Sequence, residues 1–549
     1  MPDTYILLEE ETPYDRSLKW KIHSRYFQER GNKAWLKGEV PYQITCNSAA
    51  ARQNAALVHR AALRMEEEGT LSPTDPIAVI EIACGLGLFA INFIRCFRDV
   101  DAEAGTRLAD RLHYECTDFS EENIHDAACN PALGALAEEG ILHFALLDAT
   151  RPQTMRLFPD GETVPLPPLT ATIGNYVHCC LPTSVIRKTG DTLEEKHVRL
   201  SLKVPESLEN KQDYAERYVK HPVGETITEN LNEEIHWHDL REGFFSDPLH
   251  EEVVREGAKD FPVATILYPR GSFANIQGTL PSLLPGGILL ITDKGYADAS
   301  YMEGERACEP SIHGNSFAHS LNFPLLALLA EKLGCSVTQT TDPNLSVQTL
   351  LIEKRKSETL ADLFTSLFVT HNDNVLGSDL YAAGRKFEEV SDHRTAIRFY
   401  ERALMLRPYD TWLSYRLGHC LCENGEYGRA AQAWMKGQTF DHFREYDFDF
   451  WIAYALHKNG SYAEALPFYQ RSGEREQSAT TSYNIGLCQK ALGNPAEAEQ
   501  AFAHSLELNP QYEKARDALR DLRREQEKQN AENGGTFFTR LQSALHLAS

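Results

Sequence analysis

The last third of this 549-residue chain contains small residues that recur about every 34 positions, and this spacing constrains its fold. In each unit a glycine or alanine is followed by a second alanine, and then by an aromatic side chain. The three sets are Gly384, Gly418, Ala453 and Gly486; Ala396, Ala430, Ala465 and Ala498; and Tyr400, Trp434, Tyr469 and Phe502. Small residues let two helices approach closely, and aromatic rings fill the layer between successive units. The pattern predicts an all-α solenoid.

Units of this length and pattern are typical of the tetratricopeptide repeat (TPR). We predict a TPR domain over residues 377–528, with four repeats and a charged capping helix. A linker helix is expected at 357–376 and a flexible tail at 529–549. The recurring aromatics are assigned to the core rather than to a ligand cage. Because stacked repeats form a concave groove, we expect a protein or peptide partner there.

Residues 77–356 follow another pattern, in which short β-branched apolar runs alternate with helical stretches. This alternation predicts an α/β domain with a mostly parallel sheet. Seven strands are expected, at residues 77–83, 111–117, 141–147, 170–176, 287–292, 336–341 and 346–353. Only a short turn containing Asp342 separates the last two, too little for a parallel crossover, so the final strand should be antiparallel. A Rossmann-like seven-stranded sheet with an antiparallel last strand is the arrangement of class I S-adenosylmethionine (SAM) methyltransferases.

The turn after the first of these strands has the composition of a cofactor site. Gly85 and Gly87 permit a tight turn and a close approach of ligand to backbone, and Ala83 holds the position that is often the first glycine. These residues also fit a dinucleotide fingerprint, so they do not discriminate between cofactors. Glu81 does, because SAM pockets commonly carry an acid near the methionine ammonium group, whereas nicotinamide folds use the glycine amides for pyrophosphate.

Two further acids end the next two strands. Asp118, followed by Phe119, is placed to accept hydrogen bonds from both ribose hydroxyls. Asp148, followed by Ala149, is placed to accept one from the adenine amino group. Acids also cap strand ends and solvate loops without any ligand, which is the alternative interpretation. Since Glu81 and these two acids end three adjacent strands, we favour SAM as the cofactor.

Most of residues 25–355 resembles the MidA-like family, SAM-dependent methyltransferases that include the mitochondrial complex I assembly arginine methyltransferase. The matching segments follow the family order and are Gly38–Asn47, Gln53-Asn54, Glu81–Gly87, Asn175–Pro182, Leu290–Tyr296, and His313-Gly-Asn through Asn322-Phe323. The resemblance implies that the Thr45 loop folds over the cofactor. It also implies that the strand ends at Asn175 and Asp293 line the acceptor site, and it suggests His313 as a site residue.

The chain departs from this family after the fourth strand. The family typically has Asn-Glu-x-x-Asp-Ala-Leu-Pro there, and Tyr176 and Cys179 hold the two acidic positions in this chain. Arginine methylation needs a neutral lone pair on a group with a pKa above about 12, and carboxylates normally polarise that group. Their loss weakens the case for arginine and leaves the acceptor open. Asn175 and Asp293 are the candidate catalytic residues, although a plain strand-end turn is an equal alternative for Asp293.

Residues 183–265 form a long, charged insertion that we predict to be partly helical and functional. It contains His236 and His238, whose spacing and residue type resemble those of metal ligands. Two histidines at this spacing face the same way on a strand but not on a helix, so the predicted helix argues against a metal. His178 is assigned to the core. Residues 1–76 are expected to be helices and loops that cover the cofactor.

The overall charge limits the classes of partner. With 55 Lys and Arg against 79 Asp and Glu, the net charge of −24 argues against a nucleic-acid substrate. The sequence lacks an apolar run long enough to span a membrane and a secretory signal, so we expect a cytoplasmic protein without a membrane partner. The 12 cysteines include no CxxC pair, which makes structural zinc an unfavoured interpretation. The oligomeric state is left open.

Three functions fit these features. The first is a SAM-dependent protein methyltransferase whose TPR array recruits the substrate, and we favour it because both signatures lie in one chain. The second is a SAM-binding TPR scaffold without catalysis, which the loss of the two family carboxylates favours. The third is a small-molecule methyltransferase with the 183–265 insertion as a lid.

Overall fold

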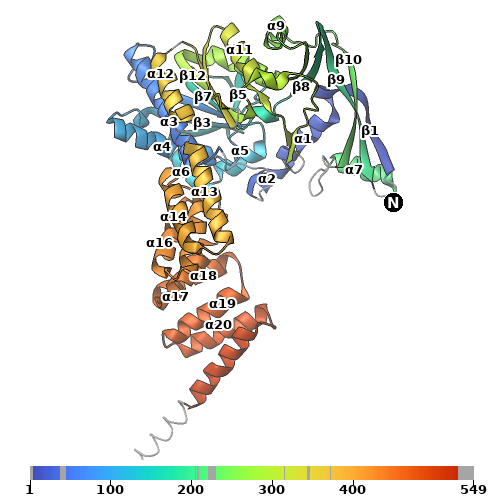
Figure 1. Ribbon diagram of the computed structural model, residues 1–549. Coiled ribbons are helices and arrows are strands. Elements are labelled where there is room, and N and C mark those ends of the chain that lie inside the picture. Colours follow the sequence, from blue (N-terminus) through green and yellow to red (C-terminus); the bar gives the residue numbers. More distant parts are fainter. Residues whose placement is uncertain are drawn as a thin grey trace, which may run out of the picture. The chain divides into compact units, whose positions relative to one another are not determined.

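The computed structural model of the chain (Figure 1) divides into two units, Met1–Leu376 and Gly377–Ser549. It describes residues 4–31, 33–36, 45–204, 206, 209–220, 230–313, 316–342, 347–355, 357–370 and 373–528. The predicted tail at 529–549 lies outside these residues, as does the Gly38–Thr45 loop apart from Thr45 itself.

A ten-stranded sheet forms the centre of the first unit. Its order is β16-β17-β12-β7-β2-β3-β4-β5-β6, with β15 paired to β12. The strands are β2 (Ile77–Ile82), β3 (Leu112–Asp118), β4 (Leu142–Leu146), β5 (Thr154–Phe158), β6 (Thr163–Pro165), β7 (Leu169–Asn175), β12 (Leu283–Tyr296), β15 (Leu321–Asn322), β16 (Ser336–Gln339) and β17 (Val347–Glu353). β2 and β7 are buried along their whole length, and the sequence of β2 is correspondingly apolar except for Glu81.

All seven predicted strands occur in this sheet. β4, β3, β2, β7 and β12 run parallel, and β17 runs antiparallel to β12, so the predicted reversal of the last strand is confirmed. The sheet is larger than the seven strands predicted, because β5 and β6 continue beyond β4 as antiparallel strands. β15 adds a short parallel pairing at the end of β12.

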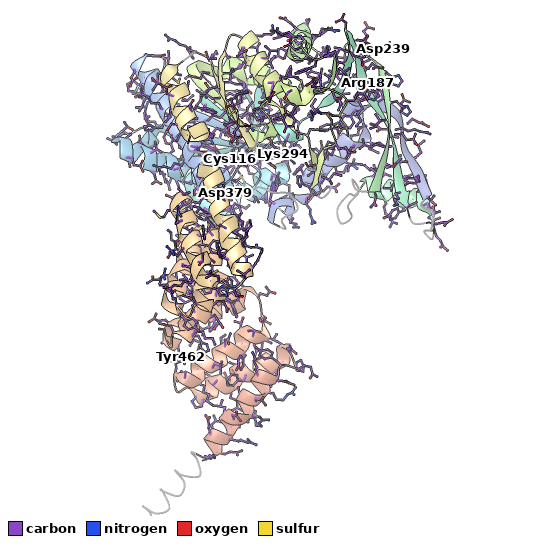
Figure 2. All side chains as sticks on the ribbon, viewed as in Figure 1. Cys116, Arg187, Asp239, Lys294, Asp379 and Tyr462 are labelled. Carbon is purple, nitrogen blue, oxygen red and sulfur yellow. The ribbon has the colours of Figure 1, made fainter. Side chains whose placement is uncertain are left out.

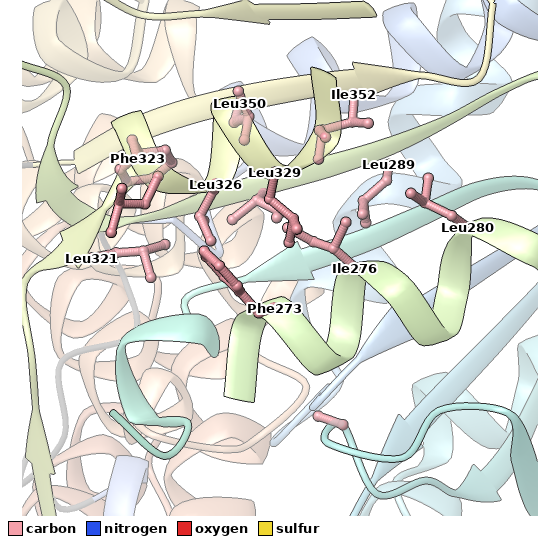
Figure 3. Packing of buried hydrophobic residues seen from close by; sticks show 14 of the residues in the cluster. Phe273, Ile276, Leu280, Leu289, Leu321, Phe323, Leu326, Leu329, Leu350 and Ile352 are labelled. Carbon is pink, nitrogen blue, oxygen red and sulfur yellow. The ribbon is translucent and has the colours of Figure 1, made fainter. Parts of the chain in front are cut away.

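Helices pack on the sheet through apolar side chains. Asn47 caps the start of α3 (Ser48–Glu67), which packs against α4 (Leu88–Ala104) and against β12. α10 (Arg270–Thr279) and α11 (Phe323–Lys332) cover the face of the sheet that carries Leu289 and Leu350 (Figure 3). The two helices meet there, with Phe273 and Ile276 of α10 beside Leu326 and Leu329 of α11.

The insertion and the N-terminal segment contain strands that the sequence did not predict. β1 (Thr4–Pro13), β8 (Ser184–Thr189), β9 (Thr192–Val204), β10 (Leu231–Asp239) and β11 (Val263–Tyr268) form a second, antiparallel sheet, which we call the outer sheet (Figure 1). Two helices, α7 (Lys211–Lys220) and α9 (Pro248–Gly257), are also present. The prediction of helix around His236 is therefore wrong, since β10 contains it. The available signal was the alternation from Val198 to Val204 in β9, where buried apolar residues alternate with Arg199, Ser201 and Lys203.

The second unit consists of stacked helices, as predicted. They are α13 (Asp373–Glu389), α14 (His393–Leu406), α15 (Thr411–Glu423), α16 (Tyr427–Phe440), α17 (Phe448–Lys458), α18 (Tyr462–Arg475), α19 (Ala479–Ala491) and α20 (Pro495–Leu508), and residues 513–528 form one more helix. A Cβ added to Gly384 would lie 2.7 Å from Tyr400, and one added to Gly486 would lie 2.5 Å from Phe502. The small residues thus make room for the recurring aromatics, which are fully buried.

The segment predicted as a linker helix packs on the first unit. It forms α12 (Glu358–Phe364), which contacts α3, followed by a helical turn at Thr365–Thr370. The Gln53 side chain donates a hydrogen bond to the Leu367 carbonyl at 2.9 Å. Among the helices described, none has the length and apolar character needed to cross a membrane.

Candidate functional site

A cavity of about 610 Å³ opens at the carboxyl ends of β2, β3, β4 and β7. β2 pairs with β3 on one side and β7 on the other, so the cavity lies where the strand order reverses, the usual ligand position in sheets of this kind. Nine predicted site residues line it: Glu81, Ala83, Gly85, Asp118, Phe119, Asp148, Ala149, Asn175 and His313. Gly87, Thr45 and Asp293 do not.

The turn between β2 and α4 has a backbone shaped by its small residues. Ala83, Gly85 and Gly87 all have positive φ angles, of 58°, 52° and 72°. A Cβ on Gly85 would lie 3.3 Å from the Trp35 indole, so the glycine permits a close approach as well as the turn. Ala83 adopts this conformation at a cost, and backbone strain of this kind concentrates at ligand sites. Gly87 contributes as the N-cap residue that precedes α4 rather than as a lining residue.

Glu81 is the most deeply buried acid of the cavity. Its carboxylate accepts a hydrogen bond from the Tyr114 hydroxyl at 3.0 Å, and no cationic side chain pairs with it among the described residues. Burial raises its pKa to about 8. A buried carboxyl in this state is stabilised in its charged form by any cation that enters the cavity.

Asp118 and Asp148 accept hydrogen bonds from neighbouring backbone N–H groups. Asp118 accepts from the amides of Gly85 at 3.2 Å and Ser120 at 2.9 Å, and burial raises its pKa. Asp148 is exposed and accepts from the amide and hydroxyl of Thr150 at 2.8 and 2.7 Å. Both therefore shape their turns, as the alternative interpretation supposes, and both also face the same cavity as Glu81.

The strand ends at Asn175 and Asp293 differ in their access to the cavity. Asn175 lines it and donates a hydrogen bond to the Thr45 carbonyl at 3.4 Å. Asp293 is fully buried and accepts from the amides of Cys179 and Lys294 at 3.0 and 2.7 Å. Burial raises the pKa of Asp293 to about 6. Its contacts hold the turn at His178–Cys180 in place, which makes it a positioning residue at this site.

Tyr176 and Cys179, which hold the family's two acidic positions, differ in their access to the cavity. Tyr176 lines the cavity with a φ of 58°, whereas Cys179 is buried beneath it and does not line the cavity. His178 is also fully buried, and burial lowers its pKa to about 3, in agreement with its assignment to the core. A Cβ on Gly174 would lie 2.5 Å from its Nε2 atom.

Aromatic residues of the N-terminal helices complete the cavity wall, and sequence reasoning did not identify them. Trp20, His23 and Phe27 come from α1 (Leu18–Arg30), and Trp35 comes from α2 (Lys33–Leu36). His23 accepts a hydrogen bond from the Phe317 amide at 3.1 Å, and burial lowers its pKa to about 4. The helical spacing of these aromatics was the available signal, but it indicates a packed face without saying what the face packs on.

Comparisons with known proteins concern the second unit. The family model of the tetratricopeptide repeat matches residues 479–512, which contain α19 and α20. The solved structure of YrrB, a TPR protein with an unusual peptide-binding site, is 21% identical and covers 27% of this chain and 76% of its own, with a TM-score of 0.25. MamA from Desulfovibrio magneticus RS-1 is 18% identical and covers 30% and 93%, with a TM-score of 0.27. No curated protein matches the chain.

Proposed function

We propose that the first unit is a SAM-dependent methyltransferase and that the TPR array recruits its protein substrate. The observation that carries this proposal is the convergence of Glu81, Asp118 and Asp148 on one cavity at the point where the strand order reverses. The strand order with an antiparallel β17 supports a class I methyltransferase fold. The matched repeat supports a role in protein interaction.

The residues present fit the chemical groups of SAM. Glu81 is a buried carboxyl without a cationic side chain among the described residues, and it suits the methionine ammonium group. Asp118 suits the ribose hydroxyls and Asp148 the adenine amino group, while Phe119, 40% exposed, offers a ring against the adenine. When bound, SAM supplies a methyl group on a sulfonium. The protein then has to align the acceptor, exclude water and remove a proton.

Once the three acids of the cavity are assigned to the cofactor, the described lining has no carboxylate left for the acceptor, which favours a neutral acceptor. Glu81, Asp118 and Asp148 are the only carboxylates among the described lining residues, and the lining there contains no Lys or Arg. The rest of the wall is largely aromatic or uncharged, and includes Tyr176. His313 also lines the cavity, and burial lowers its pKa, which favours the neutral imidazole that a proton acceptor needs.

The direct test measures SAM binding by calorimetry on the full-length protein. Asp118→Asn removes the charge that holds the ribose and should weaken SAM binding by at least roughly tenfold, since hydrogen bonds to a charged group contribute about 1.5–3 kcal/mol. Asp110→Asn is the matched control, because Asp110 is an exposed acid paired with Arg107 outside the cavity. Equal affinities in the wild type and both variants would show that Asp118 does not bind the cofactor.

The acceptor is tested by incubating the protein with methyl-tritiated SAM and a cell lysate. We expect label in a protein fraction, and less of it with the Asp118→Asn variant at a SAM concentration below the Kd of that variant. Label in low-mass compounds would select the small-molecule alternative. SAM binding without any labelled product would select the scaffold, which is favoured by one observation: Tyr176 and Cys179 leave no free carboxylate beside the acceptor.

A further inference from the structure

The outer sheet brings an acid and several histidines together on its solvent-facing side. β9 lies between β1 and β10, and both neighbours run antiparallel to it. His236 of β10 is the register partner of His197 on β9, and His238 lies two residues further along β10, on the same side. Labelled Asp239 marks the end of β10 in Figure 2.

A bulge in β1 adds the acid to this group. Glu9 pairs with Leu200 and Thr12 with Val198, so β1 has one extra residue between these pairs. The Glu10 side chain is directed to Arg199, and its Oε2 atom lies 3.3 Å from Nε of the arginine. Glu11 is directed instead to the imidazoles.

The possible ligand atoms of Glu11, His197 and His238 lie close enough together for one ion to bind all three. One ligand atom from each of Glu11, His197 and His238 lies within 4.8 Å of the other two. Glu11 contacts His238 directly, its Oε1 lies 3.9 Å from His197 Nδ1, and its Oε2 lies 3.8 Å from His236 Nε2. Zinc ligands at about 2.0–2.1 Å from the ion are roughly 3.3 Å apart in a tetrahedron, so side-chain movements of about 1 Å bring these three ligands onto an ion. His236 lies outside the group of three and has to move further to become a fourth ligand.

The neighbouring arginines pair with other acids and leave the Glu11 carboxylate to the imidazoles. Arg241 pairs with Glu195 and Asp15, and Arg199 is shared between Glu10 and Glu234. Within the described part of the chain, the ion pairs of Glu11 are made with imidazoles alone. The side chains are also accessible, with exposures of 36% for Glu11, 44% for His236 and 49% for His238.

We propose that Glu11, His197 and His238, with His236 as the fourth ligand, bind a divalent ion of the zinc type. Imidazole nitrogens and one carboxylate are a ligand set that suits Zn²⁺ and its analogue Co²⁺. The ion joins three strands, and it fastens β1 to the long strands of the insertion. β1 leads through Tyr14–Arg16 into α1, whose Trp20 lines the cavity, so the ion also fixes one wall of the cavity. The site does not depend on which cofactor the cavity binds.

The test titrates full-length protein, free of any histidine tag, with Zn²⁺ by calorimetry and with Co²⁺ by visible absorption. We expect one ion per chain and the intense visible bands of four-coordinate Co²⁺. The double variant His197→Ala/His238→Ala should lose this ion, and Glu11→Gln, which keeps the side-chain shape, should weaken its binding. Hydrogen exchange of β1 should slow when Zn²⁺ is added to the wild type only.

The matched control removes two histidines elsewhere. His113 and His143 stack with ring centroids 4.0 Å apart, and Glu115 lies 3.6 Å from His113, so this site also has two imidazoles and an acid. The double variant His113→Ala/His143→Ala should bind the ion as the wild type does. Absence of a bound ion in the wild type, or an equal loss in both double variants, overturns the proposal. Circular dichroism of each variant separates loss of the ion from loss of the fold.

Discussion

Two buried glutamates of the first unit differ in how their charge is balanced. Glu353 on β17 pairs with Arg64 at 2.9 Å, and this neighbour opposes the effect of burial on its pKa. Glu81 has the Tyr114 hydroxyl instead of a cation, and its pKa is raised to about 8. A buried ionisable group without a counter-charge is costly to the folded state, and such groups concentrate at ligand sites. This unbalanced carboxyl is the feature on which the proposed binding of a cationic cofactor depends.

The pH dependence of stability tests this account of Glu81. Its carboxyl titrates near 4.5 when unfolded and near 8 when folded, so folding takes up a proton between these pH values. The stability of the ligand-free protein should fall as the pH rises through this window, by at most about 1.4 kcal/mol per pH unit. Glu81→Gln lacks this contribution and should show a shallower slope. Urea unfolding at pH 5, 6.5 and 8 measures it.

The exposed acid Glu121 provides the control for this measurement. Its carboxylate pairs with Arg156 at the surface, with exposures of 64% and 43%, and Glu121→Gln should leave the pH slope of the wild type unchanged. If Glu81→Gln and the wild type have the same slope, the Glu81 carboxyl is charged in the folded protein at neutral pH.

At the scale of elements, the repeat helices depend on the absence of a Cβ at a few glycines. Gly486→Ala places a methyl group 2.5 Å from the Phe502 ring between α19 and α20, and we expect a loss of about 1–3 kcal/mol from overpacking. Gly428→Ala in α16 is the matched control, because no atom lies within 4 Å of its added Cβ. There alanine should stabilise by about 0.5–1 kcal/mol through its helix propensity. Denaturant unfolding followed by far-UV circular dichroism measures the free energy of unfolding and distinguishes the expected loss in Gly486→Ala from the expected gain in Gly428→Ala.

The strands of the large sheet were predictable because their side chains are buried on both faces, as in β2 and β7. The outer sheet was not. In β9 the buried pair Glu195 and Lys196 interrupts an alternation that is regular from Val198 to Val204, and the partner strand β1 lies far away in the sequence. The cavity shows the same contrast. Its acids could be predicted because they end strands that are adjacent in the sheet, whereas Trp20 could not, because only the tertiary fold brings it to the cavity.

At the scale of the whole molecule, one chain combines a cavity suited to a small cofactor with a repeat array suited to a protein partner. The array has its own buried core, which includes Tyr400, Trp434 and Tyr469. Tethering a docking surface to a catalytic unit raises the local concentration of a bound substrate, so under the proposed function the array would act on substrate binding rather than on the chemical step. Substitutions in the array are therefore expected to change KM for a protein substrate and to leave SAM affinity unaltered.

A competition experiment tests this division of roles with the wild-type enzyme. The isolated second unit, residues 377–549, is added in excess to methylation reactions that contain the full-length enzyme and a protein substrate. If the array recruits the substrate, the added unit occupies its docking segment and raises the apparent KM, while kcat and the Kd for SAM stay constant. The Gly486→Ala form of the same unit should compete less in proportion to its loss of folded fraction, which circular dichroism measures under the assay conditions. Unchanged KM at saturating competitor would show that the array serves a partner other than the methyl acceptor.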